Sequence, residues 1–323
     1  MPNPMFRASL TLMIGGALWG LLWIPLRAIE AVGVEGAWAT LVLFVAPSVV
    51  LLPLSIYRWR IIRQQLGTFL AVALFCGVSF TLYGMSLLLT EVNRAILLFY
   101  LTPLWGTLIG VFFLSEKLTV RRVVALGLGL IGLLVVLDIG VKLPWPRNVG
   151  DWMGLIAGMT WAIGSTVLFR SGGVKVLDQA SSFVLGGAVC TIIILVIAGG
   201  SLGSVPTPEA LVRSVPTSVL MALIIPPILM MTIWPITLLA PGRAGILLMT
   251  EVIFGLGSAW LIANEVLGPR ELIGAALILS ATVIEISASN PSQKAQSSNS
   301  PISSAGGSAA KRSTADDDTP AAP

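Results

Sequence analysis

Two stretches of the chain, residues 94–121 and residues 243–270, read RAILLFYLTPLWGTLIGVFFLSEKLTVR and RAGILLMTEVIFGLGSAWLIANEVLGPR. Aligned at a constant offset of 149 positions, they share seven identical residues, including the opening pair of Arg94 and Arg243. In both copies charged residues bracket an apolar run that is long enough to cross a membrane. Self-similarity of this kind indicates an internal duplication. The chain is therefore predicted to contain a duplicated membrane segment.

The composition is that of an integral membrane protein. Hydrophobic residues make up 56% of the 323 residues, charged residues make up 11%, and the mean hydropathy is +0.94. A soluble domain carries about 25% charged residues. Ten apolar runs reach spanning length, with centres at Trp19, Pro47, Gly77, Trp105, Leu130, Trp161, Val189, Leu229, Phe254 and Leu277. We expect an all-α membrane protein with ten transmembrane helices and no soluble catalytic domain.

The duplication predicts how the chain is divided. The expected parts are a first five-helix repeat at 1–141, a loop at 142–151, a second five-helix repeat at 152–288 and a tail at 289–323. The early spans also match, since Gly16 and Trp19 correspond to Gly158 and Trp161 at an offset of 142. Because five is an odd number, the second repeat enters the membrane from the opposite face, which makes the repeats inverted. The polar tail lacks apolar periodicity and is predicted to be disordered.

Basic residues near the span ends predict the orientation. Ten of them fall on one side and six on the other, and the richer side is cytoplasmic by the positive-inside rule. Both termini are then cytoplasmic, with Arg243 on the cytoplasmic side and Arg94 on the external side. The first span follows Arg7 but is full length and has no clear cleavage site, so it is expected to be retained rather than removed as a signal peptide.

Several chemistries are disfavoured by the residues present. The chain has no His, and its two cysteines, Cys76 and Cys190, lie in apolar runs where free thiols are expected. The pattern GxGxxG at 127–132 lies inside an apolar run with no preceding strand, so it predicts helix packing rather than nucleotide binding. The basic residues form no stripe that would suit nucleic acid. We expect no metal, cofactor or nucleic-acid partner, and a monomer.

A set of aromatic residues and one acid at intramembrane depth are the candidate substrate-binding residues. They are Trp19, Tyr83, Tyr100, Trp161, Trp234 and Glu251. Aromatic faces attract cations and stack on rings, so these residues suit a cavity for an amphipathic organic solute, with core packing as the alternative. A charged residue at this depth costs about 2.5–3.5 kcal/mol on insertion scales. Glu251 is therefore expected to contact an ammonium group, to couple transport to protons, or to be held for structure.

Candidate gate and hinge residues come from the span ends and the prolines. Arg94 and Arg243 open the fourth and ninth spans on opposite faces and form a candidate symmetric gate, with anchoring at the membrane interface as the alternative. Pro103, Pro226 and Pro227 lie inside apolar runs. Each removes a backbone hydrogen bond and kinks its helix, so each is a candidate hinge or a feature that merely shapes the bundle.

These features together resemble a known family. The shared residues are Trp19-Gly20 in the first span, Arg94-Ala95 and Arg243-Ala244, and Glu116 with Glu265. Over residues 9–288 the chain resembles the drug/metabolite transporter superfamily with EamA-type repeats, and within it the bacterial exporters of aromatic amino acids. The resemblance implies a bacterial inner-membrane protein whose central cavity is lined by helices 1, 3, 4, 6, 8 and 9, with helices 5 and 10 behind. It assigns Tyr83, Tyr100 and Trp161 to the cavity.

The expected function is export of aromatic and other neutral amino acids, or related small metabolites, by alternating access. An exporter of drugs or organic cations from the same superfamily is the first alternative. A phosphate-linked substrate would need intramembrane Lys or Arg, and the sequence places none far from a span end. An intramembrane lipid-modifying enzyme would need clustered Asp, Glu or His, which the sequence does not offer. A passive channel and the question of proton coupling stay open.

Overall fold

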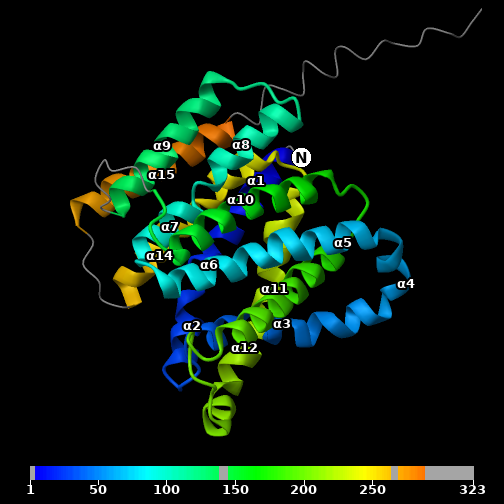
Figure 1. The fold of residues 1–323 in the computed structure, drawn as a ribbon. Helices are drawn as coiled ribbons and strands as arrows, with labels where there is room; N and C mark the ends of the chain where they lie inside the picture. The colour runs from blue at the N-terminus through cyan, green and yellow to red at the C-terminus, as the bar shows by residue number, and fades with distance from the viewer. Residues whose placement is uncertain (1–3, 138–144, 263–267, 288–323) are drawn as a thin grey trace, which may run out of the picture. The chain divides into compact units, whose positions relative to one another are not determined.

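The computed structural model describes residues 4–137, 145–262 and 268–287, and within these ranges the chain is helical with no β-strand (Figure 1). The elements are α1 Pro4–Trp19, α2 Trp23–Glu30, α3 Ala37–Tyr57, α4 Trp59–Ile62, η1 Arg63–Gln65, α5 Leu66–Val72, the π-helical turn η2 Ala73–Gly77, α6 Val78–Leu89, α7 Val92–Phe99, α8 Thr102–Phe113, α9 Val120–Val136, α10 Val149–Arg170, α11 Val176–Ala198, α12 Pro208–Ile236, α13 Pro241–Leu248, α14 Thr250–Ile262 and α15 Pro269–Ser287. The all-α prediction is confirmed for these ranges. Glu265 and the predicted tail lie outside the described residues.

Among the described residues, eight helical segments are long and apolar enough to cross a membrane. They are Pro4–Glu30, Ala37–Tyr57, Trp59–Leu89, Val92–Phe113, Val149–Arg170, Val176–Ala198, Pro208–Ile236 and Pro241–Ile262. Each coincides with one of the ten predicted spans. The other two predicted spans correspond to α9, which has only 17 residues, and α15, which carries charges near both ends. Membrane crossing by α9 and α15 therefore stays a prediction.

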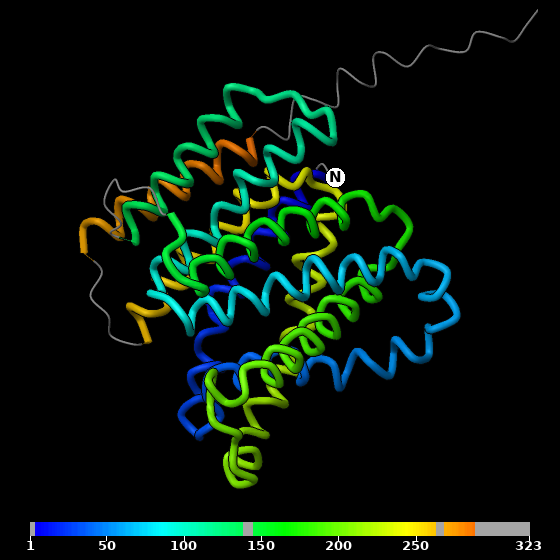
Figure 2. Tube along the Cα trace, in the orientation of Figure 1, coloured from blue at the N-terminus to red at the C-terminus, as the bar shows by residue number. Residues whose placement is uncertain are grey.

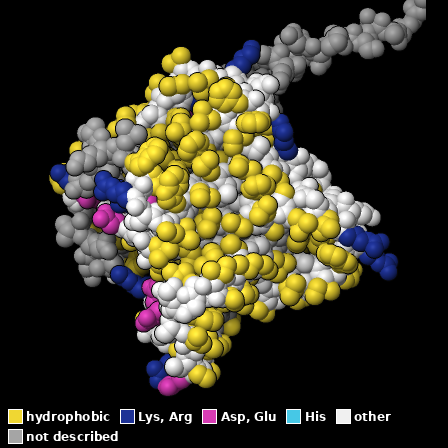
Figure 3. Space-filling model, in the orientation of Figure 1, with side chains coloured by type: hydrophobic (Ala, Val, Ile, Leu, Met, Phe, Trp, Pro, Cys, Tyr) yellow, Lys and Arg dark blue, Asp and Glu magenta, His cyan; other side chains and the backbone are white. Residues whose placement is uncertain are grey.

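The exterior supports a bilayer as the surrounding solvent. Hydrophobic side chains cover the middle of the face shown in Figure 3, and charged side chains gather toward its edges. Large apolar residues are widely exposed, for example Val49, Phe112 and Ile197, with exposed fractions of 67%, 75% and 80%. Apolar surface on this scale is unfavourable in water. It is the expected exterior for helices that face lipid chains.

Helices α9 and α15 pack along each other and lie side by side in both views (Figures 1 and 2). A Cβ atom on Gly132 would lie 2.8 Å from the carbonyl oxygen of Gly274, and one on Gly274 would lie 2.6 Å from the carbonyl oxygen of Gly132. Close backbone approach through small residues is the usual basis of helix association in lipid. Gly132, the last glycine of the GxGxxG pattern, therefore serves packing, as the sequence predicts.

The remaining helix contacts follow a regular pattern. Helix α1 packs against α12, and α6 packs against α10. Helix α3 packs against α11, and α8 packs against α13. If the two predicted repeats are exchanged, the first two contacts map onto each other and the last two map onto themselves. The contacts are thus those expected of a two-fold arrangement of the repeats, and the inversion itself stays a prediction.

Three spans are interrupted partway, and these breaks position the candidate site. The first span breaks between α1 and α2, the fourth between α7 and α8, and the ninth between α13 and α14. At the fourth span, Pro103 lacks the N–H group that would bind the carbonyl oxygen of Phe99. The hydroxyl of Thr102 donates to this oxygen at 2.6 Å instead. The ninth span breaks without a proline, and the Thr250 hydroxyl donates to Leu247 O at 2.9 Å.

Candidate functional site

A small cavity lies where the three helix breaks meet. Its lining residues come from six predicted spans and are Trp19, Phe80, Phe99, Tyr100, Thr102, Trp161, Thr232, Gly245, Leu248 and Glu251. The cavity volume is about 20 Å³, enough for about one water molecule. The spans are the first, third, fourth, sixth, eighth and ninth, the set that the resemblance implies. A solute larger than water therefore requires the aromatic side chains of the lining to move.

The apolar wall of the cavity is a cluster of aromatic rings centred on Phe80. Its ring centroid lies 5.1 Å from that of Trp19, 5.1 Å from that of Trp161 and 6.0 Å from that of Phe99. The rings of Trp161 and Phe99 meet the Phe80 ring edge to face, and Tyr83 stacks on Phe99 at 4.2 Å. Ring faces exposed in this way favour aromatic or cationic groups of a solute.

Hydrogen-bonding groups line the other wall. The indole Nε1 of Trp19 donates to Thr232 Oγ1 at 2.9 Å, and the Thr232 hydroxyl donates to Ile228 O at 2.9 Å. This bond ties the first span to the eighth across the cavity. The buried hydroxyl of Tyr100 interacts with the carboxyl group of Glu251, but it makes no hydrogen bond of standard geometry to any described residue. Tyr100 therefore presents a polar group that a solute can bind.

Glu251 supplies the only charged side chain among the described lining residues. It is half-buried in the first turn of α14, and its carboxyl group interacts electrostatically with Tyr83 and Tyr100. No described Lys or Arg lies within ion-pair distance of it. An uncompensated carboxylate in a low-dielectric cavity is unfavourable unless it binds a proton or a cation. The cavity can thus accept a protonated amine.

Four of the six predicted binding residues line the cavity, namely Trp19, Tyr100, Trp161 and Glu251. Tyr83 lies one layer behind, stacked on Phe99. Trp234 is not among the lining residues. It follows Thr232 by two positions on α12, and two residues turn a helix by about 200°, so the two side chains leave on different faces. The placement of these residues makes the first four the stronger candidates.

Several lining residues are absent from the sequence prediction. Phe80 precedes Tyr83 by three positions, which places both on one helix face. Phe99 neighbours Tyr100, and the break between α7 and α8 brings both to the cavity. The helical spacing could have pointed to Phe80. Thr102 and Thr232 carry no sequence feature that distinguishes them from other threonines inside apolar runs.

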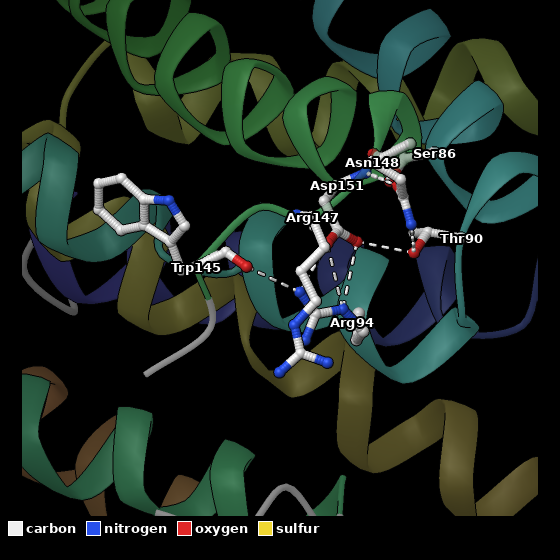
Figure 4. A network of polar contacts seen from close by, with 8 residues as sticks. Ser86, Thr90, Arg94, Trp145, Arg147, Asn148 and Asp151 are labelled. Carbon is white, nitrogen blue, oxygen red and sulfur yellow. Dashed lines mark hydrogen bonds and ion pairs between the residues drawn. The ribbon is translucent and has the colours of Figure 1, made fainter. Parts of the chain in front are cut away.

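The predicted gate residue Arg94 is held in a network at one end of the bundle (Figure 4). Its Nη2 atom lies 2.5 Å from Asp151 Oδ2, its Nε atom lies within 3.3 Å of both oxygens, and Nη2 also donates to Trp145 O at 3.0 Å. Asp151 is fully buried and also accepts from Thr90 Oγ1 at 2.7 Å and from the Arg147 amide at 2.9 Å. This network ties α7 to α10.

The other predicted gate residue, Arg243, makes different contacts. Its Nη2 atom donates to Ser9 Oγ at 3.0 Å, which ties α13 to α1. Its Nε atom lies 3.9 Å from an oxygen of Glu285 on α15, and Arg122 lies 3.9 Å from the same oxygen. Arg122 also pairs with Glu116. The charge of Arg243 is therefore balanced by a carboxylate that does not belong to α1.

The two arginines lie at opposite ends of the bundle. Helix α10 begins beside Arg94 and runs for 22 residues, or about 33 Å at 1.5 Å per residue. At its far end, Arg170 donates to Phe113 O at 2.7 Å, where α8 ends. The Glu116–Arg122 pair lies near this end, and Glu285 lies within 3.9 Å of both Arg122 and Arg243. The cavity lies between the two ends, as a pair of gates requires.

The candidate hinge prolines differ in their placement. Pro103 lies at the start of α8, directly after the break in the fourth span. Pro226 and Pro227 lie inside α12, which continues as one helix from Pro208 to Ile236. Motion at the second pair stays a prediction, while Pro103 is at an existing discontinuity.

Comparison with known proteins supports a transporter. Residues 6–138 match the EamA-like transporter family. The uncharacterized transporter YoaV of Bacillus subtilis (strain 168) is 23% identical over 288 residues, which is 85% of this chain and 94% of YoaV. A solved crystal structure has a similar fold, with a TM-score of 0.65, 18% identity, and coverage of 86% of this chain and 98% of the other. The chain is similar to an EamA-type transporter in its first half and to a bacterial transporter over most of its length.

Proposed function

We propose that this protein is a multi-pass transporter of the bacterial cell membrane that exports aromatic and other neutral amino acids by alternating access. The observation that carries the proposal is the central cavity, which joins an aromatic wall to one carboxylate and lies between two gates. The similarity to EamA-like transporters supports transport as the activity. It does not extend to the substrate, which is argued from the cavity.

The lining supplies a partner for each part of such a solute. The carboxylate of Glu251 would bind an ammonium group. The rings of Trp19, Phe80 and Trp161 would contact an aromatic side chain. The hydroxyl of Tyr100 would donate a hydrogen bond to a carboxylate, in place of the basic residue that the described lining lacks. The substrate would enter only after the Phe80 cluster moves, since the resting cavity is too small.

Inverted repeats would supply the alternating access, and paired contacts support them. A Cβ on Gly158 would lie 2.6 Å from Phe99 O, and a Cβ on Gly16 would lie 3.3 Å from Leu248 O. These two pairs are related by the offsets 142 and 149 read from the sequence. The Arg94–Asp151 and Arg243–Ser9 contacts are related by the same offsets. Exchange of the repeats would therefore exchange the gates.

Efflux of organic cations is the second candidate, because Glu251 is an acidic side chain and no described lining residue is basic. Phenylalanine and phenethylamine separate the two candidates, since they share the ring and the ammonium group and differ only in the carboxylate. A transporter of amino acids requires donors for that carboxylate. A transporter of organic cations transports the amine as well or better.

The test is uptake into liposomes that contain the purified full-length protein, with and without a pH gradient. Phenylalanine, tryptophan, threonine, phenethylamine and a cationic dye are compared, and protein-free liposomes are the control. We expect phenylalanine and tryptophan to accumulate. Transport of only the amine and the dye would replace the amino acids with organic cations as substrates. If none of the five accumulates above the control, the proposal fails. If uptake is the same with and without the pH gradient, Glu251 does not couple transport to protons.

A further inference from the structure

The two gates occupy equivalent positions in the sequence but differ in chemistry. Asp151 and Ser9 are related by the offset of 142, and the arginines that they contact are related by the offset of 149. At one gate the partner on the crossing helix is a carboxylate. At the other gate it is a hydroxyl. Gates that were equivalent would open with equal ease, so this difference favours one of the two openings.

The Arg94 gate is strongly held. Opening it requires α7 to separate from α10, which breaks the contacts of the Arg94 guanidinium with both oxygens of Asp151. Asp151 is buried, and its carboxylate also accepts hydrogen bonds from the Thr90 hydroxyl and from the Arg147 amide. Ion pairs with this two-point geometry are among the strongest hydrogen-bonded contacts in proteins. Separating such a pair inside a helix bundle leaves two buried charges unpaired, which is strongly unfavourable.

The Arg243 gate has no ion pair at the corresponding crossing, because α1 carries no Asp or Glu. Opening it requires α13 to separate from α1, which breaks the hydrogen bond from Arg243 Nη2 to Ser9 Oγ. Ser9 is neutral and its own hydroxyl donates to Met5 O at 2.8 Å within α1. The carboxylate near Arg243 is Glu285 on α15, so this contact does not cross to α1. Separation of α1 from α13 therefore breaks no ion pair between these two helices, whereas separation of α7 from α10 breaks the Arg94–Asp151 pair.

We propose that Asp151 and Ser9 determine the side from which the cavity is loaded. Asp151 keeps the Arg94 end shut in the substrate-free protein, and Ser9 allows the Arg243 end to open. The positive-inside count places Arg243 on the cytoplasmic side and Arg94 on the external side. The resting protein then takes its solute from the cytoplasm, which is the direction that export requires. The inference rests on the proposed transport function and adds its direction.

The test exchanges the two residues and measures which side reaches the cavity. Cys76 and Cys190, both free, are replaced by Ala, and Thr232→Cys places a single thiol in the lining. A membrane-impermeant maleimide is then applied to intact cells for the external side and to inverted vesicles for the cytoplasmic side. In the parent protein we expect faster labelling from the cytoplasmic side.

The exchanged variants should reverse this preference stepwise. Ser9→Asp gives Arg243 a carboxylate on α1 and should slow cytoplasmic labelling by about tenfold, the factor expected for one added charge-assisted hydrogen bond. Asp151→Ser should speed external labelling, and the double exchange should make external labelling the faster one. Ser9→Asn is the matched control, because it has the size of Asp without the charge and should change cytoplasmic labelling much less.

Each outcome decides the inference. Unchanged cytoplasmic labelling in Ser9→Asp, or an equal effect of Ser9→Asn, would overturn it. Arg94→Gln provides a second way to weaken the external gate if Asp151→Ser does not fold, and slow external labelling in a folded Arg94→Gln variant would also overturn it. Labelling needs no transported solute. If the labelling preference reverses as expected while no amino acid enters liposomes, the direction stands and the proposed substrate fails.

Discussion

The fourth and ninth spans, the two predicted copies of one segment, differ at the cavity. Both break at the middle, with Tyr100 and Met249 at equivalent positions. When the two spans are aligned at the offset of 149, Tyr100, Thr102 and Pro103 correspond to Met249, Glu251 and Val252. The break is common to both copies, whereas the proline and the acid each belong to one. The two spans thus keep the same backbone contacts, while their polar side chains differ between the halves.

The largest expected effect tests the difference between the two gates. Asp151→Ala removes the carboxylate from Arg94 and leaves the Thr90 hydroxyl without its acceptor, so the free energy of unfolding should fall by about 3–5 kcal/mol. Ser9→Ala, the equivalent change at the other gate, should cost about 1 kcal/mol because one hydrogen bond is lost. Unfolding in mixed micelles, followed by circular dichroism, measures both values. Equal losses would contradict the asymmetry.

The next effect tests the backbone contacts that both copies keep. Gly158→Ala and Gly16→Ala each force a methyl group against a carbonyl of the partner span, and each should lower the free energy of unfolding by about 1–3 kcal/mol. Gly127→Ala is the matched control, because a Cβ there meets no atom within 4 Å. Helix propensity predicts a gain of up to about 1 kcal/mol for that control. A loss at Gly127 as large as at Gly158 would show that helical glycines, and not these contacts, matter.

The acid that only the ninth span carries should affect recognition. Glu251→Gln keeps the shape of the side chain and removes its charge, so the concentration for half-maximal uptake of phenylalanine should rise by about tenfold, the cost of one charge-assisted contact. Glu209→Gln removes an exposed acid from the start of α12 and should leave uptake unchanged. Uptake into liposomes measures both variants. Normal uptake by the Glu251 variant would remove this residue from the binding site.

The smallest expected effect concerns the proline that only the fourth span carries. The ninth span breaks without a proline, so Pro103→Ala should preserve the break and change the free energy of unfolding by less than about 1 kcal/mol. The Thr102 hydroxyl would still cap Phe99 O. Unfolding and initial uptake rates provide the measurement. A large loss of uptake with unchanged stability would instead identify Pro103 as a hinge.

The sequence predicted much of the framework of the site. Apolar runs located eight supported spans, because the bilayer requires long uninterrupted helices of low charge. Glu251 was identified by its cost inside such a run, and it does line the cavity. Trp19 and Trp161 were proposed because of their depth in their spans, and both line the cavity. Trp234 was placed less well, because depth along a helix does not say which face a side chain occupies.

The partners of the gate residues could not be read from local patterns. Asn93 is the polar neighbour of Arg94 in the chain, yet the carboxylate that binds Arg94 is Asp151, 57 positions away. The offset of 142 does relate Asp151 to Ser9, but it says nothing of their contacts. Contact depends on how α7 crosses α10, which is a property of packing between distant segments.

The sequence was sufficient to predict a helical membrane protein with duplicated segments, because apolar length, charge placement and a constant offset can all be read along the chain. Which side chains meet is seen only in the folded protein. In the structure, three helix breaks meet at one cavity and the Phe80 cluster lines it. Arg94 contacts a carboxylate on the crossing helix, where Arg243 contacts a hydroxyl. The reason is physical: spanning helices are specified locally by transfer of apolar residues into lipid, whereas cavities and gates arise from contacts between them.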